Sequence, residues 1–109
     1  MEPRLATSVL AGALIRKAQG EGGFAAVLAK GDATSGAILL ILTEKGANPR
    51  LLERLLQPDG NYAWAQPIEN SAEVPAFVAR RRQFDPDLWL IELDVPSAER
   101  FTAEMTGFD

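Results

Sequence analysis

The chain of 109 residues is 47% hydrophobic and 24% charged, has a net charge of −4, and contains neither cysteine nor histidine. This length and composition fit one globular domain with one core, and the acidic balance argues against generic nucleic-acid binding. The two missing residue types exclude disulfides, cysteine nucleophiles, Ser-His-Asp triads, and zinc sites with histidine or cysteine ligands.

The first predicted element is a helix that has Thr7 or Ser8 as its N-cap and ends near Gln19. Its apolar residues repeat at three and four positions and form one face: Leu10, Ala13, Leu14 and Ala18. The apolar stretch 9–15 is too short for a signal peptide, runs into two basic residues and has no cleavage site after it. We therefore expect a helix of a mature cytoplasmic protein.

Residues 24–30 and 37–43 are predicted strands, and the turn-rich loop 31–36 between them predicts a hairpin. The second strand is apolar from Ala37 to Leu42, which is typical of a strand buried on both faces, so we expect it near the centre of a sheet. This is also the longest apolar run, and it is far shorter than the ~20 residues that a membrane-spanning helix needs.

Residues 44–48 are predicted to form a loop, and the segment after them is ambiguous. The leucines of residues 50–56 suit either a helix or a twisted strand. The turn signal of residues 58–61, followed by Tyr62 and Trp64 in alternation with small residues, favours a second hairpin made of residues 50–56 and 61–67.

A second long helix is predicted from Val74, with Asn70 in a possible capping box before it and Pro75 in its first turn. Pro86 should end it, because a proline disfavours helical geometry in the residue before it. The expected inner face consists of Val74, Phe77, Val78 and the stem of Arg81.

Residues 88–93 are again largely apolar and predict a central strand. Pro96-Ser97 then predicts the start of a short helix, with Phe101 and Met105 on one side. The order α-β-β-β-β-α-β-α indicates a single α+β domain over residues 1–109, with a mainly antiparallel sheet of about five strands, two long helices and a short C-terminal helix.

Arginines are the first candidate binding residues. Arg80, Arg81 and Arg82, together with Arg16 and Arg4, could hold a phosphate or carboxylate. Consecutive residues are spread around a helix by about 100° each, so the three neighbours cannot all face one ligand. A solvated helix end and a contact with an anion or nucleic acid both remain open.

Carboxylates are densest at Asp85, Asp87, Glu92 and Asp94, and oxygen ligands suit magnesium or calcium. Ordinary turn and strand-end chemistry explains half of this spacing, and we predict no metal and no cofactor. Residues 1–84 carry ten basic and eight acidic side chains, whereas residues 85–109 carry seven acidic ones and only Arg100. We expect this acidic region to fold back near the basic end of the second helix.

The two tryptophans carry different expectations. Trp89 heads an apolar strand and should lie in the core, whereas Trp64 lies on a mixed strand and is either a core residue or a surface contact. Gly31 to Gly36 is no phosphate loop, since no Lys-Ser/Thr pair and no helix follow it.

The chain resembles a bacterial family called domain of unknown function 1491. The residues that carry the likeness are Arg4-Leu5, Ala13-Leu14-Ile15-Arg16, Gly31-Asp32 with Gly36, Trp64, Arg80-Arg81, Asp85-Pro86-Asp87-Leu88-Trp89 and Glu92. The last run is the most specific. Leu93 and Asp94 depart from the more acidic strand end of the family, which weakens a metal site there. The resemblance implies a small cytoplasmic domain with no known activity, so it supplies no catalytic residues.

The sequence therefore favours a non-catalytic binding or regulatory module. Its partner would be an unknown protein or a second copy bound through an exposed sheet edge, with no membrane involved. The candidate contact residues are Arg16, Arg80, Arg81, Arg82, Asp85, Asp87 and Trp64. Two alternatives remain open: a metal-dependent phosphoester hydrolase that uses carboxylates and arginines, and a nucleic-acid-contacting accessory protein that uses the arginine helix.

Overall fold

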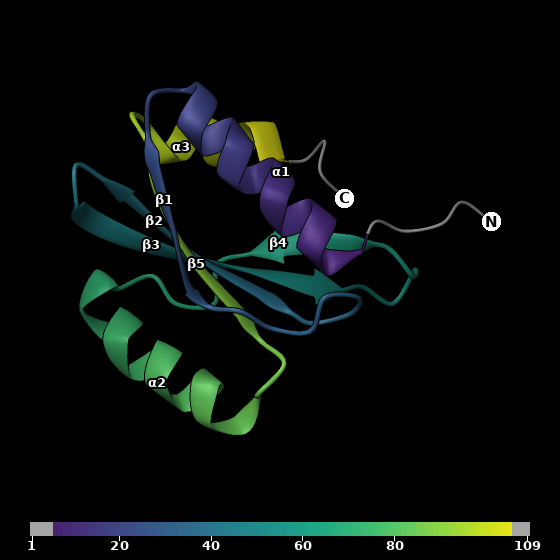
Figure 1. The fold of residues 1–109 in the computed structure, drawn as a ribbon. Helices are drawn as coiled ribbons and strands as arrows, with labels where there is room; N and C mark the ends of the chain where they lie inside the picture. The colour runs from purple at the N-terminus through teal and green to yellow at the C-terminus, as the bar shows by residue number, and fades with distance from the viewer. Residues whose placement is uncertain (1–5, 106–109) are drawn as a thin grey trace.

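The computed structural model describes residues 6–105 as one five-stranded sheet between two layers of helices (Figure 1). The elements are α1 (Thr7–Gly20), β1 (Phe24–Ala29), β2 (Ile38–Glu44), β3 (Ala47–Leu56), β4 (Tyr62–Ala65), a 3-10 turn (Ser71–Glu73), α2 (Val74–Phe84), β5 (Trp89–Asp94) and α3 (Ala98–Glu104). The predicted α+β class and element order are confirmed. No helix among residues 6–105 is long and apolar enough to cross a membrane.

The strands lie in the order β1-β5-β2-β3-β4. Neighbouring strands are antiparallel except β2 and β5, which run parallel. The two strands with apolar residues on both faces, β2 and β5, are internal, as predicted, because each of their faces meets a layer of helices.

The predicted hairpin of residues 24–30 and 37–43 is wrong. β5 lies between these two strands and pairs with both of them. The loop 31–36 instead crosses the start of β5, where the Nε1–H of Trp89 donates to the carbonyl of Asp32 at 2.7 Å. Turn residues predict where the chain reverses, but they do not predict which strands become neighbours.

The predicted loop of residues 44–48 is a tight turn that joins β2 to β3 as a hairpin. Lys45 and Gly46 both have positive φ angles, of 53° and 75°, as a two-residue turn of this kind requires. Both carboxylate oxygens of Asp94 accept from the turn, from Lys45 N at 2.9 Å and from Gly46 N at 2.6 Å. The ambiguous segment 50–56 is a strand, and its predicted hairpin with β4 is confirmed.

Each face of the sheet has its own core (Figure 1). On one face α1 and α3 cover the sheet, and Leu14 and Phe101 pack with the β-strand residues Leu40 and Ile91. On the other face α2 packs through Val74, Phe77 and Val78 against Leu39, Leu51 and Leu90. The predicted inner faces of the second and third helices are thereby confirmed, and Ser97 caps α3 by accepting from Arg100 N.

The start of α1 differs from its prediction. The residue before the helix is Ala6, and no side chain caps it. The amides of Thr7 and Ser8 donate instead to the carbonyls of Thr34 and Ala33, at 3.2 and 2.9 Å. The backbone of the loop after β1 therefore satisfies the helix N-terminus, a contact across 27 residues that a local capping rule cannot detect.

Candidate functional site

The predicted contact residues do not form one site, because the sheet separates them. Trp64 lies on the face covered by α1 and α3, and Arg16 is exposed on α1. Arg80 to Arg82, Asp85 and Asp87 lie on α2 and the loop after it, on the opposite side of the sheet. Arg4 lies outside the described residues.

Arg81 joins α2 to the sheet. Its Nη1 donates to Oε1 of Glu53 on β3, and its Nη2 lies 3.7 Å from Oδ2 of Asp85. The Glu53 side chain is 10% exposed and that of Arg81 is 26% exposed, so this ion pair is largely removed from water. Arg80 and Arg82 are exposed, which confirms that the three arginines diverge. The central arginine is thus a structural residue.

Asp85 and Asp87 form the junction from α2 into β5. The Asp85 carboxylate accepts from Asp87 N at 3.2 Å, and the Asp85 carbonyl accepts from Leu88 N at 3.3 Å. Asparagine and aspartate side chains stabilise turns in this way. Neither residue forms a metal cluster: among residues 6–105 no group of three or more acidic, histidine or cysteine side chains could hold a metal ion.

This junction is packed by two glycines from the loop after β1. A Cβ at Gly31 or at Gly36 would lie 2.2 Å from the carbonyl oxygen of Asp87, far inside van der Waals contact. Asp32 N donates to that same carbonyl at 3.1 Å. The glycines, Asp32 and the run Asp85 to Trp89 are therefore parts of one structural clasp, although they are separate motifs in the sequence.

The tryptophans are both packed in the interior. Trp89 is 5% exposed, so its predicted core position is confirmed. Trp64 is half-buried and packs against the core under α1 and α3. Its Nε1 is buried and has no hydrogen-bond partner among residues 6–105.

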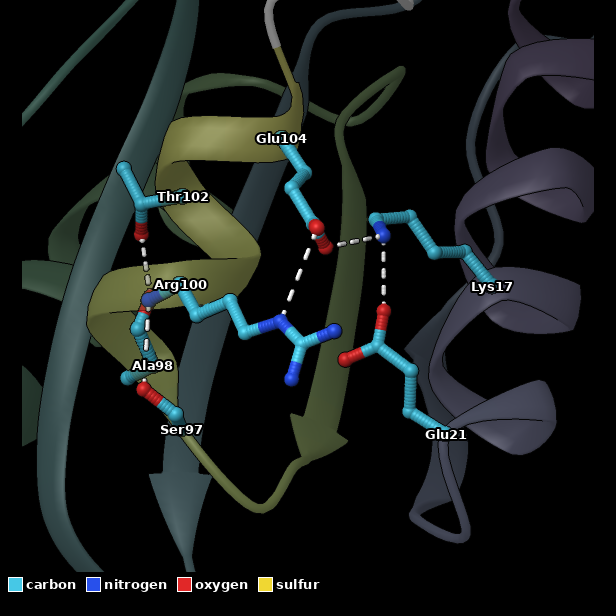
Figure 2. A network of polar contacts seen from close by, with 7 residues as sticks. All are labelled: Lys17, Glu21, Ser97, Ala98, Arg100, Thr102 and Glu104. Carbon is cyan, nitrogen blue, oxygen red and sulfur yellow. Dashed lines mark hydrogen bonds and ion pairs between the residues drawn. The ribbon is translucent and has the colours of Figure 1, made fainter.

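Lys17 links α1 to α3 (Figure 2). Its Nζ donates to Oε1 of Glu104 at 2.8 Å and to Oε2 of Glu21 at 2.6 Å, and it lies 5.2 Å from the centre of the Phe101 ring. The hydrogen bond that Lys17 donates to Glu104, and then the one that it donates to Glu21, raise the pKa of Lys17, and the bond accepted from Lys17 lowers the pKa of Glu104. Part of the acidic region therefore folds onto α1 through Glu104, and Asp85 pairs with an arginine of α2.

A cavity of about 350 Å³ lies beside the N-terminus of α1. Its lining includes Thr7, Ile38, Arg54, Leu55 and Tyr62, and the Arg54 guanidinium stacks 3.9 Å from the Tyr62 ring centre. No carboxylate of the described chain lines it, so the cavity offers no pair of groups for general acid–base catalysis.

The most exposed apolar element is β1, which forms one edge of the sheet. Its sequence Phe-Ala-Ala-Val-Leu-Ala has no charge, and Phe24 is 76% exposed, Val27 46% and Leu28 46%. A hollow of about 230 Å³ beside Phe24 is lined by Thr43, Glu92 and Asp94, among others. The sequence showed the apolar strand but not its place at an edge, because strand order depends on β5.

Comparisons with known proteins identify relatives of the same fold. No curated protein matches the chain. The crystal structure of a DUF1491 family protein from Caulobacter crescentus CB15 has a TM-score of 0.80 and 33% identity, over 89% of this chain and 94% of that one. An NMR structure of a DUF1491 family protein from the same source has a TM-score of 0.81 and 32% identity, over 92% and 94%.

The solution structure of protein Atu0922 from A. tumefaciens is more distant, with a TM-score of 0.72 and 27% identity over 91% of this chain and 92% of that one. The model of the family described as "Protein of unknown function (DUF1491)" matches residues 5–103, nearly the whole chain. The chain therefore belongs to the DUF1491 family, whose function is unknown.

Proposed function

We propose that this protein is a non-catalytic binding module that accepts an extended, uncharged segment of a protein partner along the edge of β1. The observation that carries the proposal is the exposure of Phe24, Val27 and Leu28 on an edge strand without a single charged residue. Edge strands usually carry charges, proline or a bulge, or are covered, since bare edges pair with other chains. β1 has no charge or proline, and its register shifts only between Val27 and Ala29, which leaves residues 24–27 as a regular edge. We also propose a location in the bacterial cytoplasm, because a cysteine-free chain suits a reducing compartment.

The backbone of β1 supplies the means of binding. Among the strands of residues 6–105, β5 is the one that pairs with it, so the backbone groups that point away from β5 are left for a further strand. A segment that added there would gain main-chain hydrogen bonds and would cover the exposed apolar side chains. The opposite edge, β4, is shorter, with four residues that are all half-buried.

Several charged side chains make contacts that hold the fold together, and this supports a role without catalysis. Glu53 and Arg81 pair under α2, Lys17 and Glu104 pair between α1 and α3, and Asp94 holds the turn between β2 and β3. Each of these groups completes a contact of the fold. None of these groups lines the cavity of about 350 Å³, so no acid–base pair from residues 6–105 converges on it.

The test compares two variants with matched exposure. Phe24→Lys adds a charge to the β1 edge, whereas Phe84→Lys adds the same charge at the end of α2, where the phenylalanine is 75% exposed against 76% for Phe24. Tagged full-length protein is used to capture partners from an extract of the cells that produce it. We expect the wild type and Phe84→Lys to retain the same partner, and Phe24→Lys to lose it. Equal capture by all three proteins would refute the proposal.

A further inference from the structure

We infer that the hollow beside Phe24 binds the ammonium or guanidinium group of one lysine or arginine, carried by the segment that binds along β1. The inference rests on the proposed function and refines it, since the otherwise uncharged segment then has one basic side chain. The hollow of about 230 Å³ lies over the end of β5, on the face of the sheet where α2 packs against Leu90. Of the residues in 6–105 that line it, none is basic and two are acidic, Glu92 and Asp94.

The carboxylate of Glu92 is the observation that selects a cation. The side chain is half-buried and lines the hollow, yet no hydrogen bond or ion pair joins it to residues 6–105. Every other buried or half-buried carboxylate of these residues has a partner within the fold: Glu21, Asp32, Glu44, Glu53, Asp85 and Asp94. The fold thus leaves one sheltered acceptor without a partner, and a cationic donor forms the strongest hydrogen bond with such a group.

Two neighbours of Glu92 add to the site. Thr43 is 4% exposed and lines the hollow, and its hydroxyl makes no hydrogen bond with residues 6–105, so it can accept from the same cation. The ring of Phe24 borders the hollow at the edge, and an aromatic ring attracts a cation placed over its face. Asp94 adds negative charge while its oxygens hold the turn amides. Salt screens such a sheltered pair much less than an exposed one.

The register of β1 gives a long basic side chain a path to Glu92. Ala26 is the partner of Glu92 in the ladder, within the regular part of the edge, and it is exposed. A strand added beyond β1 lies two strand spacings from β5, or roughly 10 Å. The apolar stem of a lysine or arginine opposite Ala26 can lie over this small residue and bring its charged end to Glu92, whereas a valine or serine stops short.

Selection from a phage-displayed library of short random peptides, on immobilised full-length protein, tests the inference. We expect the wild type to select peptides that share one lysine or arginine among residues that favour strands. Glu69→Gln, which removes an exposed carboxylate in the loop before α2, should select the same peptides, whereas Glu92→Gln should select none with this shared basic residue. Circular dichroism checks that the variants are folded, and Glu92→Thr replaces Glu92→Gln if the latter is not.

A synthetic peptide of the selected sequence then measures the pairing. Citrulline in place of its arginine, or norleucine in place of its lysine, removes the charge and keeps the length of the side chain. We expect this change to weaken binding to the wild type by about tenfold or more, the usual effect of losing a hydrogen bond between charged groups. The same change should leave the affinity for Glu92→Gln nearly unaltered.

The outcomes separate this inference from the proposed function. Selected peptides that share no basic residue, and that Phe24→Lys loses but Glu92→Gln retains, overturn the inference and leave the proposed function standing. A basic peptide whose neutral form weakens equally on the wild type and on Glu92→Gln also overturns it, because the charge then meets another group. A wild-type chain that selects no peptide, or only peptides that Phe24→Lys binds equally well, overturns both.

Discussion

Gly31 and Gly36 are two positions at which the packing of the fold leaves no room for a side chain. A side chain at either position would collide with the carbonyl of Asp87, where two separate backbone segments meet and neither can move freely. We expect Gly31→Ala to lower the free energy of unfolding by about 1–3 kcal/mol, the usual effect of overpacking. Urea denaturation of the purified protein measures this change.

Gly20 provides the control for this prediction. It is the last residue of α1, and a Cβ there would meet nothing within 4 Å. We expect Gly20→Ala to leave stability unchanged or to raise it by about 0.4–1 kcal/mol, because alanine restricts the unfolded chain more than glycine does. Equal unfolding midpoints for the two alanine variants would show that the clasp is not tightly packed.

The ion pairs of Lys17 make a prediction about pH. The folded state lowers the pKa of Glu104 below its ordinary value of 4.5, so the stability it contributes is present above pH 4.5 and is lost as pH falls through the lowered pKa. Lys17 has a raised pKa, so its contribution is present below its ordinary value of 10.5 and is lost as pH rises through the raised value. Both contributions are complete at neutral pH.

We therefore expect Glu104→Gln to be less stable than the wild type at neutral pH and to approach it as pH falls from 4.5 through the lowered pKa of Glu104. Thermal unfolding followed by circular dichroism across this range measures the difference. Glu69→Gln, an exposed position in the loop before the second helix, is the control and should follow the wild type throughout. A gap between Glu104→Gln and the wild type that does not change with pH would contradict the assignment.

Single residues were predictable where their signal is local. The interior position of Trp89 followed from the apolar strand it heads, and the divergence of Arg80 to Arg82 followed from helix geometry. The pairing of Arg81 with Glu53 did not follow, because it requires knowing that β3 passes beneath α2 with its carboxylate on that face. The sequence did contain one signal for this pairing, which was a glutamate, Glu53, placed among leucines on a predicted strand.

At the level of elements, the contact between α2 and β3 depends on that ion pair. Removing one partner from a buried pair leaves the other charge without compensation, at a cost that reaches about 3–5 kcal/mol when both are fully buried. Arg81 is a quarter exposed, so we expect Arg81→Met to cost about 2 kcal/mol. Arg82→Met, on the exposed side of the same helix, should change stability by less than about 0.5 kcal/mol.

A double-mutant cycle identifies the pair directly. Glu53→Leu alone leaves the Arg81 charge with the more distant Asp85 carboxylate, at 3.7 Å, and Arg81→Met alone leaves the Glu53 carboxylate without its arginine. The double variant removes both charges of the pair. We expect the double variant to lose less stability in urea than the sum of the single variants. Strict additivity would mean that each side chain acts by packing alone.

The order of the strands in the sheet is the part of the fold that could not be predicted from the sequence. Five strands were recognised from their composition, but the hairpin of β1 and β2 was wrong because β5, from much later in the chain, inserts between them. A signal was present: a strand with apolar residues on both faces belongs in the interior of a sheet, with a neighbour on each side. Local turn residues carry no information about such distant pairing.

For the molecule as a whole, the structure differs more from the predicted site than from the predicted fold. The fold class follows from patterns along the chain, and it was confirmed. The candidate residues were chosen mainly by charge, but the sheet separates them, and the side chains of Arg81 and Asp85 are used in contacts of the fold. The surface that the proposed function uses is an apolar edge strand, and its place at the edge depends on the strand order, which could not be predicted from the sequence.

The response to salt distinguishes this apolar edge from an interface made by charges. Exposed charges attract each other weakly once salt screens them, and contacts with nucleic acid weaken steeply as salt rises. Apolar contacts are not screened, and salts excluded from protein surfaces strengthen them. We therefore expect a partner bound along β1 to stay bound, or to bind slightly more tightly, between low salt and about 1 M salt, where the screening length is only about 3 Å.

Capture of the partner at both salt concentrations measures this, with Phe24→Lys as the reference for a weakened edge. A partner that is released as salt rises would instead point to the exposed Arg80 and Arg82, and the apolar strand would then not be the binding surface of the molecule.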